Sequence, residues 1–243
     1  MSARLVLATH NPHKLGELRA VLLPALASLR PDDVASSSDV GAPDVPETGV
    51  TFVENALLKA RALAAFTGLP AVADDSGLCV DVLGGAPGVF SARWSGRHGD
   101  DVANTALLLA QLADVPDAHR GAEFRCAAAL VLPDGAERVT TGVMRGRLIT
   151  APRGSGGFGY DPVLVPDDQP ARADRPLTSA ELTAEEKNAI SHRGTAFRAL
   201  APWVVAALTV RAPGRRRPSP GGAGSRGRRS SPSPRPRCTP PRG

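Results

Sequence analysis

The chain has 243 residues, of which 42% are apolar and 4% aromatic, so Leu, Val and Ala must supply most of a buried core. No apolar stretch is long enough to cross a membrane, and no apolar segment near the start resembles a signal peptide. The cysteines Cys79, Cys126 and Cys238 are far apart and odd in number, and they indicate neither a metal site nor a disulfide framework. We therefore expect a cytoplasmic protein.

The positive charge is concentrated at the C-terminal end. The ten arginines of residues 211–243 outweigh the net charge of +5 of the whole chain, so residues 1–210 carry a net charge of −5. The terminal segment is rich in Arg, Pro, Gly and Ser, and such a composition does not form a packed core. We predict a folded domain over 1–210 and a disordered tail over 211–243. The tail could bind nucleic acid non-specifically, although we favour a tail without a function.

The first strand and helix frame a possible anion site. Residues 4–8 are apolar enough for a buried strand, and apolar residues then recur at helical spacing as far as Pro24. Asn11 is a favoured N-cap, Pro12 suits the first helical position, and Lys14 places a cation in the first turn. A helix N-terminus with a nearby cation can bind phosphate, but this segment alone favours an ordinary capped helix with a surface lysine.

A second helix begins at a capping box. Residues 29–46 are polar and predict a loop with one short strand, after which Thr51 and Glu54 have the spacing of a reciprocal helix cap. We expect this helix to continue to Gly68. The cap gives Glu54 a structural role. Lysines on a helix usually face solvent, so the helix pattern alone assigns no function to Lys59.

The segment AVADDSG, residues 71–77, is the sequence's best candidate for chemistry. The apolar residues 71–73 predict a buried strand that carries Asp74 and Asp75 to its end, where ligands bind in open α/β sheets. Neighbouring side chains on a strand point to opposite faces, so the two carboxylates should have different functions. Asp, Ser and Gly are also ordinary turn residues, and an ordinary turn is the alternative.

The middle of the chain predicts strands over 78–83, 123–132 and 138–149, with a helix over 101–112. Residues 154–159 contain the pattern GxGxxG, but a strand over 160–165 is expected to follow, whereas a dinucleotide-binding turn needs a helix. We interpret the glycines as a ligand-binding loop in which Phe158 and Tyr160 can stack.

The last part of the domain is helical. Thr183 and Glu186 form a second capping box, which opens a short helix carrying Lys187. A final helix over 195–208 contains Pro202, which should kink it. His192 and Arg193 stand between these two helices, where they are well placed to contact a ligand.

Five segments together resemble the inosine triphosphate pyrophosphatase family, also called XTP/dITP diphosphatases. They are THNPHK, ETGVTFVENALLKA, AVADDSGLCVDVLGGAPGVFSARWSG, GGFGYDP and LTAEEKNAISHRG, and they follow the family's order and spacing over nearly all of residues 1–210. The resemblance implies an α/β fold with a long twisted mixed sheet flanked by helices, in two lobes around a nucleotide cleft. It further implies a homodimer that hydrolyses ITP, dITP and XTP to the monophosphate and pyrophosphate with Mg²⁺, which removes deaminated purines from the nucleotide pool.

The resemblance also implies roles for individual residues. Asp75 would accept a proton and bind magnesium. The family often has a glutamate where Pro46 stands here, so Glu47 is the candidate for the second metal ligand. The substrate-binding residues would be Thr9, His10, Asn11, Pro12, His13, Lys14, Lys59, Ser76, Phe158, Gly159, Tyr160, Asp161, Lys187, His192 and Arg193.

Two other functions are compatible with parts of the sequence. A pyrophosphatase of the Maf type, which prefers modified pyrimidines or methylated nucleotides, has a related architecture, but the FGYD and SHR segments favour the first family. A nucleic-acid-binding protein acting through the arginine tail is the second alternative, and the acidic body of the chain argues against it.

Overall fold

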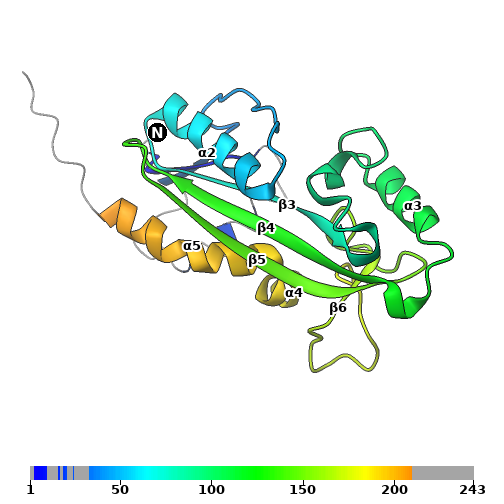
Figure 1. Ribbon diagram of the computed structural model, residues 1–243. Coiled ribbons are helices and arrows are strands. Elements are labelled where there is room, and N and C mark those ends of the chain that lie inside the picture. Colours follow the sequence, from blue (N-terminus) through cyan, green and yellow to red (C-terminus); the bar gives the residue numbers. More distant parts are fainter. Residues whose placement is uncertain (1–2, 10–15, 17–18, 21–23, 25–32, 210–243) are drawn as a thin grey trace, which may run out of the picture. The chain divides into compact units, whose positions relative to one another are not determined.

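The computed structural model describes residues 3–9, 16, 19–20, 24 and 33–209 (Figure 1). The phosphate-binding residues expected at 10–14 and the tail expected at 211–243 lie outside this set, so both stay predictions. No helix among the described residues is long and apolar enough to cross a membrane.

A mixed sheet forms the centre of the described structure, with six strands in the order β2-β1-β3-β4-β5-β6. Strand β1 pairs in parallel with β2 and β3, and the other pairs are antiparallel. This confirms the expected α/β fold with a mixed sheet. The strands are β1 (Leu5–Leu7), β2 (Val34–Ser36), β3 (Ala71–Val80), β4 (Gly121–Val131), β5 (Glu137–Leu148) and β6 (Leu164–Pro166).

Helices cover both faces of the sheet, and Figure 1 shows α2 and α5 on opposite sides of the long strands. Ala71 and Ala73 pack with the buried face of α2, whereas Val72 packs in the cluster that includes α5. A third apolar cluster joins α3 to the other end of the sheet. The helices are α2 (Phe52–Thr67), α3 (Asp101–Gln111), α4 (Ala184–Ile190) and α5 (His192–Thr209), with short 3₁₀ helices η2 (Asp81–Leu83), η3 (Gly88–Arg93) and η4 (Asp117–His119).

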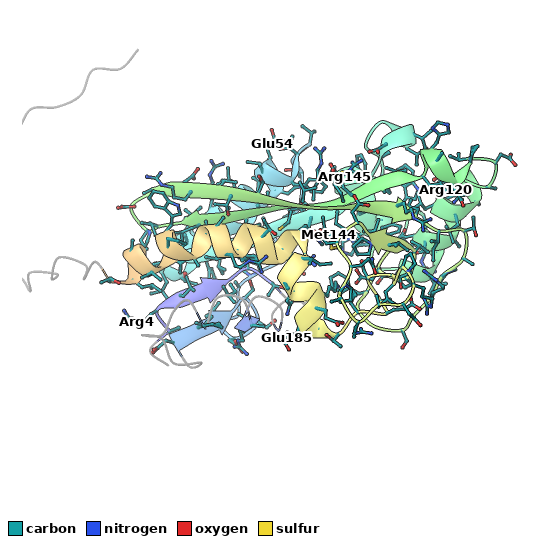
Figure 2. The ribbon with its side chains drawn as sticks, turned by 90° about the horizontal axis from the view of Figure 1, so that it is seen from below. Arg4, Glu54, Arg120, Met144, Arg145 and Glu185 are labelled. Carbon is teal, nitrogen blue, oxygen red and sulfur yellow. The ribbon has the colours of Figure 1, made fainter. Side chains whose placement is uncertain are left out.

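Both predicted capping boxes are present. The Thr51 hydroxyl accepts a bond from the Glu54 backbone N–H, and the Glu54 carboxylate accepts one from the Thr51 N–H. Thr183 does the same at the start of α4. Figure 2 labels Glu54 beside α2, and its bond to the Thr51 N–H gives this carboxylate a structural function.

Two arginines form hydrogen bonds at the end of the sheet that lies next to α3. The buried Arg120 guanidinium donates to the carbonyl oxygens of Leu112 and Val115, at 2.6 and 2.9 Å, and so satisfies backbone acceptors where α3 ends. On the neighbouring strand, Arg145 bonds the carboxylates of Asp81 and Glu123. Both arginines lie toward the same end of β4 and β5 in Figure 2.

Three expected boundaries were wrong. Residues 74–77 form neither a strand end nor a turn, because β3 continues through them to Val80, paired along its whole length with β4. The strand expected over 160–165 is reduced to Leu164–Pro166, because the Asp161 carboxylate accepts a bond from the Phe158 N–H and closes a turn there. The last helix starts at His192, not Thr195, because its first turn bonds back to Ser191.

Candidate active site

A cavity of about 880 Å³ opens beside β3, at the point where β1 ends. Strand β1 pairs with β3 only at Ala71 and Val72, so no described strand borders residues 74–77 on that side. The cavity can therefore be reached by side chains from both faces of the sheet. It is lined by every described residue that the sequence nominated: Thr9, Glu47, Lys59, Asp75, Ser76, Phe158, Gly159, Tyr160, Asp161, Lys187, His192 and Arg193.

On the α2 face, Asp75 and Glu47 are linked through Lys59. The Lys59 Nζ lies 2.6 Å from Glu47 Oε1 and 3.6 Å from Asp75 Oδ1, and the lysine side chain is only 13% exposed. Lys59 therefore does not face solvent as most helical lysines do, and its ammonium group lies in the cavity beside these carboxylates. Burial alone would lower the Lys59 pKa, but the charges of Asp75, Asp74 and Glu47 raise it above its ordinary value. Lys59 thus stays a cation.

The environment of Asp75 favours its protonated form more than water does. Burial is the largest cause of its raised pKa, and the negative charges of Glu47 and Asp74 act in the same direction. Lys59 and a hydrogen bond from Asn55 partly oppose the shift. A carboxylate with a raised pKa binds a proton more readily, which is the property required of a general base.

On the α5 face, Asp74 is paired with Arg193. The Arg193 Nε lies 3.0 Å from Asp74 Oδ2, and a second guanidinium nitrogen donates to the Ser76 hydroxyl at 2.6 Å. Asp74 and Asp75 therefore do have different partners on opposite faces, as the strand alternation predicts. The start of α5 can approach this closely because Gly142 of β5 has no side chain, and a Cβ there would overlap the His192 carbonyl oxygen.

Two cations lie close to the Phe158 ring. Lys187 Nζ is 5.2 Å and the Arg193 guanidinium 5.1 Å from the ring centroid, within the range of cation–π attraction. Lys187 also forms a buried ion pair with Asp161 at 2.7 Å. The ring of His192 stacks on Phe124, with centroids 5.0 Å apart. The cavity therefore combines an aromatic surface with several hydrogen-bond donors.

The donor set fits magnesium. Magnesium prefers oxygen ligands and is usually held by one or two carboxylates together with waters and substrate phosphates. Asp75 and Glu47 line the same cavity, and the Glu47 charge raises the Asp75 pKa, so a bound cation would relieve their mutual repulsion. Within the described part of the chain, no group of three or more His, Cys, Asp or Glu side chains is placed to hold a metal ion.

Two residues at this site were missed by the sequence reasoning. Asn55, on α2, donates from Nδ2 to Asp75 Oδ2 at 3.0 Å. Asp101, on α3, accepts a bond at 2.8 Å from the backbone N–H of Gly159. Asn55 stands four residues before Lys59, and this i,i+4 spacing on one helix face could have indicated it. No comparable local pattern marks Asp101, whose partner is distant in the sequence.

Known proteins similar to this chain agree on one family. The model of the Ham1 family matches residues 5–203. A dITP/XTP pyrophosphatase of Streptomyces coelicolor is 66% identical over 201 residues, which cover 83% of this chain and 96% of that protein. A crystal structure of a nucleoside-triphosphatase, a dITP/XTP pyrophosphatase, from Mycobacterium abscessus has 52% identity and a TM-score of 0.64, covering 82% of this chain and 98% of its own. A HAM1 protein of Coxiella burnetii has 40% identity and a TM-score of 0.72, covering 84% and 100%. The chain belongs to the Ham1 family.

Proposed function

We propose that this enzyme hydrolyses the deaminated purine nucleotides ITP, dITP and XTP to the monophosphate and pyrophosphate, with Mg²⁺, and so removes them from the nucleotide pool. Its family and its relatives make it a nucleoside triphosphate pyrophosphatase. The observation that supports the finer proposal is a single cavity lined by Asp75, Lys59 and Glu47 and also by Phe158, which has two cations close to its ring.

The α2 side of the cavity suits the triphosphate. Lys59 supplies a positive charge for phosphate oxygens, and Asp75 can accept the proton of an attacking water. Asp75 and Glu47 would hold the metal. When bound, Mg²⁺ would neutralise charge on the phosphates and position the reacting groups.

The Phe158 side suits the base. The aromatic ring offers a stacking surface, while Lys187 and Arg193 offer hydrogen-bond donors beside it. Hypoxanthine and xanthine present a keto acceptor at position 6, whereas adenine presents an amino donor that would meet another donor. By analogy with base readout in nucleic acids, one well-formed pair of this kind provides about 1–3 kcal/mol of discrimination.

The proposal is tested by pyrophosphate release from ITP, XTP, GTP and ATP, with and without Mg²⁺, using the full chain. We expect magnesium-dependent release from ITP and XTP and little from GTP and ATP. Asp75→Asn should abolish turnover, whereas Asp134→Asn, in the turn between β4 and β5, should not. Equal turnover of all four nucleotides would refute the base selectivity, and full activity of Asp75→Asn would remove that residue from the mechanism.

We further propose that the chain forms a homodimer and acts in the cytoplasm. Light scattering coupled to size-exclusion chromatography tests the first point, and cell fractionation tests the second. A monomeric mass across the working concentration range would contradict the dimer.

A further inference from the structure

We propose that Asn55 is a positioning residue, which orients the Asp75 carboxylate and ties it to the segment that carries Glu47. Asn55 lies in the first turns of α2 and is completely buried, with an exposed fraction of 0%. The proposal rests on the proposed function, because it assigns to Asn55 a task in the reaction that Asp75 would perform.

The polar groups around Asn55 form a closed ring. The amide Nδ2 donates to Asp75 Oδ2 at 3.0 Å, and the amide Oδ1 accepts from the Gly49 N–H at 2.8 Å. Lys59, one turn further along α2, approaches Asp75 Oδ1 at 3.6 Å and Glu47 Oε1 at 2.6 Å. Asn55 and Lys59, on one face of α2, therefore each connect Asp75 of β3 to the loop that carries Glu47 and Gly49.

The loop side of this ring is tightly fitted. A Cβ placed on Gly49 would lie 2.7 Å from both the Asn55 Oδ1 and the Glu54 Cβ, closer than real side chains come. The neighbouring N–H groups of Val50 and Thr51 bond the Glu54 carboxylate at 2.7 and 3.1 Å. The loop thus packs closely against α2, and Gly49, which bonds Asn55, is the nearest of these three loop residues to Glu47 in the sequence.

Only an amide side chain of this size satisfies both partners. Asp75 needs a donor and the Gly49 N–H needs an acceptor, and Asn supplies one of each. Because Asn55 holds one carboxylate oxygen of Asp75 and Lys59 approaches the other, the plane of the carboxylate is fixed. An ionised carboxylate can accept about four hydrogen bonds, so Asp75 can still bind a water or a metal ion, in a direction set by the orientation of its carboxylate.

A buried asparagine can also be merely structural, and α3 provides a matched comparison. Asn104 is buried to a similar degree, with an exposed fraction of 1%, and its Oδ1 accepts bonds from the backbone and hydroxyl of Ser95 at 2.7 and 2.8 Å. It holds a loop to a helix as Asn55 does, but its partner Ser95 does not line the cavity, whereas Asp75, the partner of Asn55, does. Replacing either asparagine should destabilise the fold, and only Asn55 should affect the reaction.

The experiment compares Asn55→Leu with Asn104→Leu in the full chain. Leucine keeps the branching and the number of side-chain heavy atoms and removes both hydrogen bonds. We expect Asn55→Leu to lower kcat for ITP by about 10–100-fold, the usual effect of losing a group that orients a catalytic ligand, with KM changed less than about threefold. Asn104→Leu should keep kcat within about threefold. If Asn55→Leu does not fold, Gly49→Ala strains the same ring from the loop side and should lower kcat similarly.

A second measurement does not depend on turnover. In urea unfolding, Asn55→Leu should cost less stability when Asp75 is already Ala, because the donor bond has then lost its acceptor. Equal losses in the two backgrounds would overturn the inference, as would an unchanged kcat in Asn55→Leu or an equal kcat loss in Asn104→Leu. A wild-type chain inactive on ITP would instead refute the proposed function, and the unfolding result would still test the contact.

Discussion

Replacing Asp101 with Ala should weaken nucleotide binding without stopping the chemistry. Asp101 is the first residue of α3, and its carboxylate holds the Gly159 N–H at 2.8 Å. Gly159 adjoins Phe158, the aromatic surface of the cavity. The carboxylate therefore fixes the segment on which we expect the base to stack, while Asp75 and Lys59 belong to other elements.

The size of the effect follows from the contacts that remain. A hydrogen bond to a charged group contributes about 1.5–3 kcal/mol. Other bonds also hold this segment: Tyr160 Oη donates to the Ser91 carbonyl oxygen at 3.0 Å, the Thr105 hydroxyl reaches the Gly159 carbonyl oxygen at 3.4 Å, and the Phe158 N–H donates to the Asp161 carboxylate at 2.8 Å. Since each 1.4 kcal/mol corresponds to a factor of ten, the apparent affinity for ITP should fall by about 10–100-fold. The kcat should stay within about threefold.

Initial rates of pyrophosphate release over a range of ITP concentrations separate the two parameters. Asp101→Asn keeps an oxygen acceptor and should restore most of the affinity. Val102→Ala, at a neighbouring side chain that is 82% exposed, should behave as wild type. Asp100→Ala removes the N-cap bond to Ala103 and tests whether loss of helix stability alone raises the KM. A KM equal to wild type in Asp101→Ala, or an equal rise in Asp100→Ala, would refute the reasoning.

Three further results are expected. Lys187→Met leaves the buried Asp161 without its ion-pair partner at 2.7 Å and should cost about 3–5 kcal/mol in urea unfolding, so a loss below about 1 kcal/mol would contradict it. Bonds from Arg175 and then from the Thr178 N–H lower the Glu181 pKa from 4.5 to about 2, so its stabilisation is present above pH 4.5 and lost as the pH falls toward 2. Between pH 4.5 and pH 2, the Tm of Glu181→Gln should fall less steeply than the Tm of the wild type. If the two Tm curves run parallel, Glu181 is not a source of the pH dependence. Deleting residues 211–243 should leave ITP turnover unchanged, and any salt-sensitive RNA binding of the full chain should disappear with the tail.

The local signals in the sequence were reliable where neighbouring residues satisfy each other. Both capping boxes could be predicted because Thr51 and Glu54, or Thr183 and Glu186, need only each other and the first helical turn. The separation of Asp74 from Asp75 was predictable because alternation is a property of every strand. These features require no knowledge of the rest of the chain.

The extent of β3 and the partners of its acids could not be predicted in this way. The polar, turn-like residues 74–77 remain in a strand because β4 supplies a complete backbone ladder beside them, with the small Ala127 and Ala128 opposite Asp75 and Asp74. The partners of Lys59 could not be predicted, because its helix alone gives no sign of a nearby carboxylate pair. Asp101 is 58 residues from Gly159, and only the tertiary fold brings them together.

The position of the cavity follows from a difference in strand length. The sequence predicted a ligand at the end of the strand bearing Asp74 and Asp75, whereas the strand that ends there is β1, which pairs with β3 only as far as Val72. Beyond that point one edge of β3 has no strand partner among the described residues, while β4 keeps the other edge rigid. Consecutive acids on such a strand project to opposite faces and still border one cavity. A site open to both faces can receive Lys59 from α2 and Arg193 from α5, so two separately packed helices contribute opposite walls.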